Sequence, residues 1–235
     1  MAKKELSTEQ KQLGKDLLVI IIISIVTLAT YIAIQSPVSA YALNSEQPVL
    51  LRVLLMASFQ FGLTGLGISI VSIIRKESFF SYGLRKKGAA TSIALSALCF
   101  VPHLIYLFAM GQVTFYMPFQ SVWTTKDVVF SGFPISVIGF LITAIAWGFF
   151  EGFNYVVISD KINKRYPSQN KWLNWGAIIC AILCILIHGA IGVTVEGIIH
   201  TLTIVIIIYG MLMVKEYTGN AWGCVFVFLF LWNAF

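Results

Sequence analysis

The chain has 235 residues, of which 58% are hydrophobic and only 11% are charged, and its net charge is +6. Soluble domains carry charges on roughly a quarter of their residues, so this composition excludes a soluble globular protein and is typical of a membrane protein. The positive charge does not indicate nucleic-acid binding, because the basic residues lie in loops between apolar runs rather than among aromatic residues on one polar face. All four cysteines lie in apolar runs without CxxC or CxxH spacing, so we expect neither disulfides nor a zinc knuckle.

Apolar stretches follow one another along the whole chain with only short polar breaks. A membrane-spanning helix needs about 20 apolar residues, and each stretch reaches or approaches this length. The predicted fold class is therefore all-α, with a single membrane domain formed by a polytopic transmembrane helical bundle of about seven spans. A basic leader at 1–16 precedes the predicted spans, which are 17–34, 49–74, 89–110, 133–159, 173–192, 197–214 and the short 221–235.

The lysines and arginines alternate with these spans. Fourteen of them precede the first span or follow the second, fourth and sixth, whereas the opposite side has only Arg52 and Lys126. Because basic flanks are retained on the cytoplasmic side, we expect a cytosolic N-terminus, an external C-terminus and a location in the plasma membrane. The alternative for the first span is a cleaved signal peptide, with small residues at 38–40, although its apolar run exceeds the roughly 7 to 15 residues of a signal core.

A few ionisable side chains are expected at membrane depth. Each costs about 2.5 to 3.5 kcal/mol on insertion scales and is therefore a functional candidate. Glu151 lies in the fourth apolar run and His188 in the fifth, and a short loop makes their helices an antiparallel pair. The expected helix ends leave a depth difference of about 10 Å between the two side chains, within the uncertainty of those ends.

Helical periodicity places Thr143, Trp147, Asn154 and Tyr155 on one face with Glu151. A carboxylate beside an imidazole can hold and activate a water molecule as a general base. The amides of Asn233 and Asn154 are candidate donors to the oxyanion that peptide hydrolysis would develop. The alternative is a buried polar pair that sets helix register without any chemistry.

The remaining histidines have weaker patterns. Glu196 and His200, spaced i and i+4, can supply two metal ligands, but no reliable third is evident, so a solvated hydrogen-bonded pair is the simpler interpretation. His103 follows a proline in the third run and is interpreted as a packing residue. These patterns identify no metal and no cofactor.

Four segments in order make the chain resemble the CPBP family of intramembrane proteases, which includes CAAX prenyl-protein endopeptidases and relatives linked to bacteriocin self-immunity. Residues 82–87 (YGLRKK) resemble its "GLR" segment, 151–156 (EGFNYV) its EExxxR motif, 184–188 (CILIH) its FxxxH motif, and 218–222 (TGNAW) the start of its last catalytic helix. The resemblance implies that Glu151 and His188 activate the attacking water and that an asparagine of a third, HxxxN-type motif stabilises the oxyanion.

The chain departs from the family pattern at several positions. Gly152 replaces the second glutamate and Val156 the arginine, while Cys184 replaces the phenylalanine. Counted from Trp222, the third-motif histidine and asparagine fall on Phe228 and Trp232, so that Asn233 serves only after a one-residue shift of register.

The leading hypothesis is therefore an intramembrane endopeptidase, active or degenerate, with Glu151, His188 and Asn233 as site residues. Its expected partners are the lipid bilayer and a membrane-tethered peptide or protein, and the sequence indicates no oligomeric state. A catalytically silent scaffold or bacteriocin-immunity factor that binds a peptide is the second hypothesis. A proton-coupled transporter is the third, although no inverted repeat is evident.

Overall fold

A computed structural model describes residues 6–170, 172–188 and 194–235 of the chain. Within these ranges the regular structure is helical, with no strand. Two segments, η1 and η3, are π-helices inside longer helical stretches, and η2 is a short 3₁₀-helix. In chain order the elements are α1 (Thr8–Ala33), α2 (Gln35–Leu43), α3 (Val49–Phe61), η1 (Gly62–Leu66), α4 (Gly67–Arg75), η2 (Phe79–Tyr82), α5 (Ala89–Ala109), α6 (Thr125–Phe130), α7 (Ile135–Thr143), η3 (Ala144–Phe150), α8 (Glu151–Arg165), α9 (Trp175–His188), α10 (Val195–Thr218) and α11 (Trp222–Phe230).

Among the described residues, five helical stretches are long and apolar enough to cross a membrane, by length and composition. They are α1, α3 to α4, α5, α7 to α8, and α10, and they correspond to five of the predicted spans. The chain is thus a helical bundle with the character of a membrane-embedded protein. The other two predicted spans correspond to shorter helices, since α9 has 14 residues and α11 has 9. Residues 189–192 of the predicted span 173–192 lie outside the described residues.

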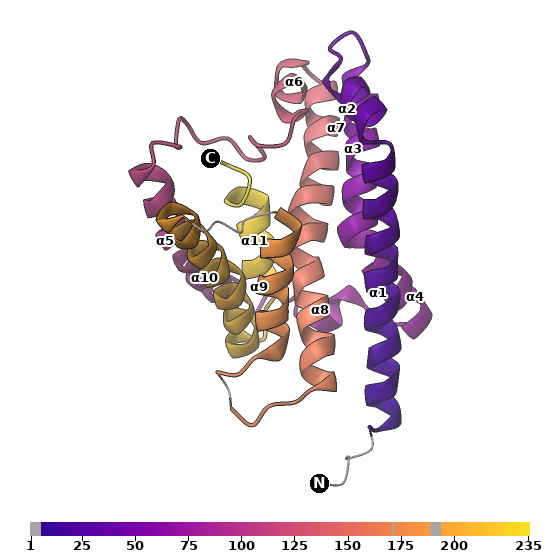
Figure 1. Ribbon diagram of the computed structural model, residues 1–235, viewed down its shortest axis with the longest axis vertical. Helices are drawn as coiled ribbons and strands as arrows, with labels where there is room; N and C mark the ends of the chain where they lie inside the picture. Colours follow the sequence, from indigo (N-terminus) through magenta and orange to yellow (C-terminus); the bar gives the residue numbers. More distant parts are fainter. Residues whose placement is uncertain (1–5, 171, 189–193) are drawn as a thin grey trace.

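The stretch α7–η3–α8 runs through the middle of the bundle and separates two groups of helices (Figure 1). On one side α1 packs against α8 and α4, while α3 packs against α7. On the other side α9 and α11 contact α8, and α5 and α10 pack together farther out. Residues of both groups therefore face the central stretch.

A network of ion pairs joins the helices at the end where α1 begins and α8 ends. The ammonium group of Lys161 lies 3.0 Å from a carboxylate oxygen of Asp16 and 3.0 Å from one of Glu77, although its side chain is only 1% exposed. Arg75 pairs with the other Asp16 oxygen at 2.6 Å, and the Tyr82 hydroxyl donates to Glu77. The predicted leader is thus part of α1 from Thr8 onward, and Asp16 ties it to α4 and α8.

At the opposite end, Arg52 is buried rather than free in a loop. Its guanidinium donates to Asp127 at 2.8 Å and to the carbonyl of Ala42 at 3.2 Å. The segment between α5 and α6 covers the residues that follow α11, because the backbone nitrogens of Met117 and Ser121 donate to the carbonyls of Ala234 and Asn233. Its tertiary contacts, rather than membrane depth alone, determine where this segment lies.

Two of the motif-like segments, 82–87 before α5 and 218–222 before α11, lie against each other. Ala221 N donates to the carbonyl of Gly83 at 2.9 Å. The fully buried Asn220 donates its amide to the carbonyls of Arg85 at 2.7 Å and Lys87 at 2.9 Å. Asn220 also caps α11, because its side-chain oxygen accepts from Trp222 N at 2.9 Å. The start of α11 is thereby held by the segment that leads into α5.

Candidate functional site

Glu151 lies at the junction between η3 and α8, in the interior of the bundle. Only 5% of the residue is exposed. Its Oε2 accepts a hydrogen bond of 2.7 Å from the side-chain amide of Gln60, which stands on α3 just before η1. This bond leaves Oε1 as the carboxylate oxygen that faces other groups.

His188 is the last residue of α9 and faces the same carboxylate. Its Nδ1 lies 2.9 Å from the carbonyl oxygen of Cys184, which can only accept a hydrogen bond, so Nδ1 carries a proton. In the neutral ring, Nε2 therefore holds the lone pair, and it lies 3.8 Å from Glu151 Oε1. This separation is too long for a direct hydrogen bond and suits one water molecule that contacts both atoms.

Glu151 and His188 meet because both lie at the same depth. The helix that carries Glu151 continues to Arg165, past the predicted end at residue 159, and α9 begins at Trp175 instead of 173. At 1.5 Å per residue, Glu151 is about 21 Å from the end of α8 and His188 about 20 Å from the start of α9. The expected depth difference is thus wrong, and the connection 166–174 is shorter than predicted.

Aromatic side chains line the side of the pair that α11 covers. The Trp232 ring packs edge-on against His188 with centroids 5.6 Å apart, and it contacts Phe228 at 5.1 Å. Phe228 in turn stacks on Tyr155 at 5.4 Å. Phe228 and Trp232 are the positions that the resemblance would match to the third-motif histidine and asparagine, so aromatic rings stand at the site where that motif has an imidazole and an amide.

Gly152 stands where α8 and α11 approach most closely on this face. A Cβ at this position would lie 2.8 Å from the carbonyl oxygen of Cys224 and 3.1 Å from Val225 Cα, both backbone atoms of α11. Val156, at the position of the motif arginine, is fully buried in the hydrophobic core. The volume for a second glutamate and an arginine is therefore occupied by α11 and by the core.

The two asparagines proposed as oxyanion donors have different surroundings. The Oδ1 of Asn233 accepts from the Ser121 hydroxyl at 2.8 Å, and no hydrogen bond joins Asn233 to Glu151 or His188 among the described residues. Its amide nitrogen is buried and has no partner in the part of the chain that the structure describes. The Oδ1 of Asn154 is likewise buried without a partner in those ranges. The structure does not bring Asn233 into the pair, although it leaves one buried donor unused next to Trp232.

Gln60 is a partner of Glu151 that the sequence patterns did not indicate. It is the single side-chain amide in the second apolar run, and a polar side chain at membrane depth is the feature that marks it as a functional candidate. The π-helices were also missed. Because η3 widens the helical turn, Thr143 and Trp147 do not keep their α-helical phase with Glu151, and the predicted polar stripe is interrupted. Both π-helices border the Gln60–Glu151 bond, and such segments are frequent at functional sites.

The outer histidines form a separate cluster between α5 and α10. The rings of His103 and His200 lie 5.5 Å apart, and Tyr106 stacks on His200 at 5.3 Å. His103 Nδ1 lies 2.8 Å from the Thr203 hydroxyl, so His103 has the hydrogen bond and packing role that we expected of it. No group of three histidine, cysteine or acidic side chains close enough to hold a metal ion occurs in the described ranges.

A comparison of the chain with protein-family models, with curated proteins and with solved structures finds no match.

Proposed function

We propose that this chain is a CPBP-like intramembrane endopeptidase that hydrolyses a peptide bond of a membrane-tethered substrate. The observation that carries the proposal is the approach of Glu151 Oε1 to His188 Nε2 at 3.8 Å, from consecutive antiparallel helices inside an apolar bundle. Two further contacts support it. The segments at 82–87 and 218–222 lie together, and Gln60 fixes the orientation of the carboxylate.

The proposed chemistry uses a water molecule between the two side chains. Glu151 accepts a proton from the water, and the hydroxide adds to the carbonyl carbon of the substrate. The Gln60 amide holds the second carboxylate oxygen, so Oε1 keeps one orientation toward His188. His188 positions the water through Nε2 before the attack. When the C–N bond then breaks, the proton passes from Glu151 to the leaving amine.

We also propose seven membrane passes with a cytosolic N-terminus in the plasma membrane. Two short helices, α9 with 14 residues and α11 with 9, would complete the count. The ends rich in lysine and arginine, including those of α4 and α8, carry the assignment of the cytosolic side.

A catalytically silent scaffold or immunity factor that holds a peptide is the second candidate. The observation that favours it is the aromatic wall, because Phe228 and Trp232 supply a peptide-binding surface and no proton-transfer group. Both candidates use the same site and differ in whether Glu151 performs chemistry.

The deciding experiment compares cells that express the wild type, Glu151→Gln or His188→Ala. New peptide termini in membrane proteins are measured by terminus-selective mass spectrometry. We expect wild-type-specific cleavage products that fall at least about 100-fold in both variants, the usual contribution of a general base. Glu196→Gln, a change at an exposed carboxylate in the first turn of α10, is the control and should retain cleavage.

Two outcomes separate the candidates. If wild type and Glu151→Gln give the same termini at matched protein levels, the endopeptidase proposal fails. If both proteins then crosslink the same membrane peptide, and Trp232→Ala does not, the scaffold is supported instead.

A further inference from the structure

A cavity lies at the end of α8 and the start of α9, away from the Glu151–His188 pair. Its volume is about 750 Å³, within the usual range of small-ligand pockets. The end of α8, the connection to α9 and the end of α10 line it, and the lining includes Asn170, Trp172, Asn174, Met213, Glu216 and Tyr217. Because long apolar helices end here beside polar loops, the cavity stands at the level where lipid headgroups meet protein.

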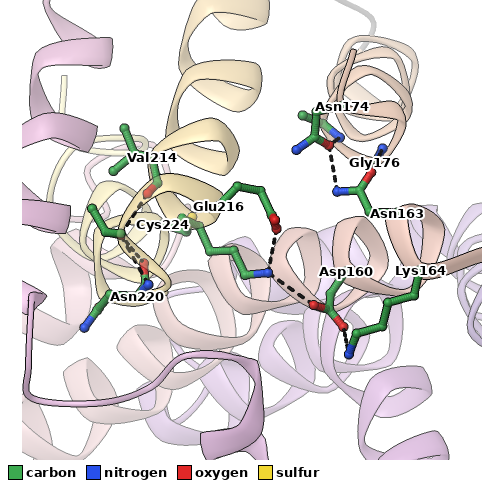
Figure 2. Close-up of polar contacts among 12 residues, drawn as sticks. Asp160, Asn163, Lys164, Asn174, Gly176, Val214, Glu216, Asn220 and Cys224 are labelled. Atoms are coloured by element: carbon green, nitrogen blue, oxygen red, sulfur yellow. Dashed lines mark hydrogen bonds and ion pairs between the residues drawn. The ribbon is translucent and has the colours of Figure 1, made fainter. Parts of the chain in front are cut away.

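Glu216 supplies the carboxylate among the described residues that line this cavity. Its Oε1 accepts from Lys215 at 2.8 Å, and Lys215 also pairs with Asp160 at 3.2 Å, so that one ammonium is shared by two carboxylates (Figure 2). Oε2 of Glu216 has no partner among the described residues, and 41% of the side chain is exposed. This oxygen is available to a cationic group in the cavity.

Amide donors lie on the other wall. Asn174 is only 8% exposed, and its Oδ1 accepts from Asn163 Nδ2 and Ala177 N, both at 2.8 Å. Figure 2 shows the Asn163–Asn174 contact beside the start of α9. The amide nitrogen of Asn174 has no partner within the described ranges, and neither does that of Asn170, whose Oδ1 accepts from Trp172 N at 3.0 Å. Such neutral donors suit phosphate oxygens.

Aromatic and apolar surface completes the lining. Trp172 is 76% exposed and Tyr217 is 85% exposed, so both rings are free to contact a ligand cation. Met213 and Val214 of α10 provide a surface for the start of an acyl chain. The cavity therefore combines a free carboxylate oxygen, aromatic rings, unpaired amides and apolar contacts.

We propose that this cavity is a binding site for a zwitterionic phospholipid with an ammonium headgroup, of the phosphatidylethanolamine type. The ammonium lies at Glu216 and the two rings, the phosphate accepts from the asparagine amides, and the acyl chains follow α10 into the bilayer. An anionic lipid without an amine places no cation against Glu216. The site is distinct from the Glu151–His188 pair and does not depend on catalysis.

The test is native mass spectrometry of the full chain in detergent micelles, titrated with phosphatidylethanolamine or phosphatidylglycerol of the same acyl chains. We expect the wild type to bind phosphatidylethanolamine about tenfold more tightly, the effect of roughly one charge-assisted hydrogen bond. Glu216→Gln, whose amide oxygen still accepts from Lys215, should lose this preference. Tyr217→Ala, at a position that is 85% exposed, should weaken the same binding severalfold.

Glu196→Gln, a carboxylate change near the other end of α10, is the matched control and should bind both lipids as the wild type does. Equal retention of the two lipids by the wild type overturns the proposal, and so does unchanged binding by both Glu216→Gln and Tyr217→Ala. Soluble glycerophosphoethanolamine distinguishes the source of the headgroup. If it competes at the same concentration as the lipid, the occupant is a free phosphoamine and the lipid assignment is wrong.

Discussion

At the scale of single residues, Gly152 shows how one small side chain determines the packing beside the Glu151–His188 pair. The glycine lets the backbone of α11 approach α8, and that approach brings Phe228 and Trp232 beside Tyr155 and His188. A second glutamate at this position would require α11 to move away. The departure at 152 and the aromatic residues of α11 are thus parts of one packing arrangement.

We predict that Gly152→Ala destabilises the protein by about 1 to 3 kcal/mol, the usual cost of overpacking. The added methyl group would lie 2.8 Å from a backbone oxygen, which cannot rotate away as a flexible side chain can. Thermal unfolding in detergent micelles measures the effect. Gly132→Ala is unsuitable as a control because an alanine at its φ of 76° would be strained, whereas Ala144→Gly in η3 tests a helix change without added volume. An unchanged melting temperature for Gly152→Ala would contradict the packing argument.

At the scale of elements, charges inside the bundle hold helices together where the apolar faces do not specify a partner. Lys161 of α8 binds Asp16 of α1 and Glu77 beyond α4, and all of these charges are compensated within the network. Removal of one partner from a buried pair costs several kcal/mol, because the remaining charge stays buried. The network therefore determines how the first two spans pack against the helix that carries Glu151.

Tyr82 gives this network a pH dependence. Burial, followed by its hydrogen bond to Glu77, raises the pKa of the Tyr82 hydroxyl well above its ordinary value of 10.0. Above pH 10 the Tyr82 hydroxyl of the unfolded chain loses its proton, while that of the folded chain keeps it. The contribution of Tyr82 to the free energy of unfolding is therefore full below pH 10 and falls as the pH rises. Thermal unfolding between about pH 8 and pH 11 should show a steeper loss for the wild type than for Tyr82→Phe. Parallel pH profiles for the two proteins would contradict this role.

At the scale of the whole molecule, the helix ends rich in basic residues lie together. The start of α1 meets the end of α8, where Gln10 donates to the carbonyl of Arg165 at 2.9 Å. The α2–α3 connection lies at the other end (Figure 1). The bundle has five long apolar helices among the described residues. The proposed orientation places the end with the start of α1 and the end of α8 in the cytosol, because basic flanks are retained there.

That orientation predicts the labelling of single cysteines in intact cells. Ser45→Cys, in the exposed α2–α3 connection, should react with a membrane-impermeant maleimide from outside. Ser168→Cys, in the connection between α8 and α9, should react only after permeabilisation. The unsubstituted chain, whose cysteines are buried or partly buried, gives the background. The reverse pattern would invert the proposed topology, and equal labelling of both would remove the alternation of spans.

The sequence by itself determined the helical class, five long apolar helices and the ionisable residues worth attention, because hydropathy, helical period and charge are local properties of the chain. Only the tertiary structure decided that Glu151 meets His188, that Gln60 binds Glu151 across 91 positions of sequence, and that Asn233 binds Ser121 instead of joining the pair. The physical reason is that these contacts depend on where each helix ends and how closely backbones approach. The π-helices shift side-chain phase and Gly152 admits α11, and neither effect can be read from periodicity in one segment.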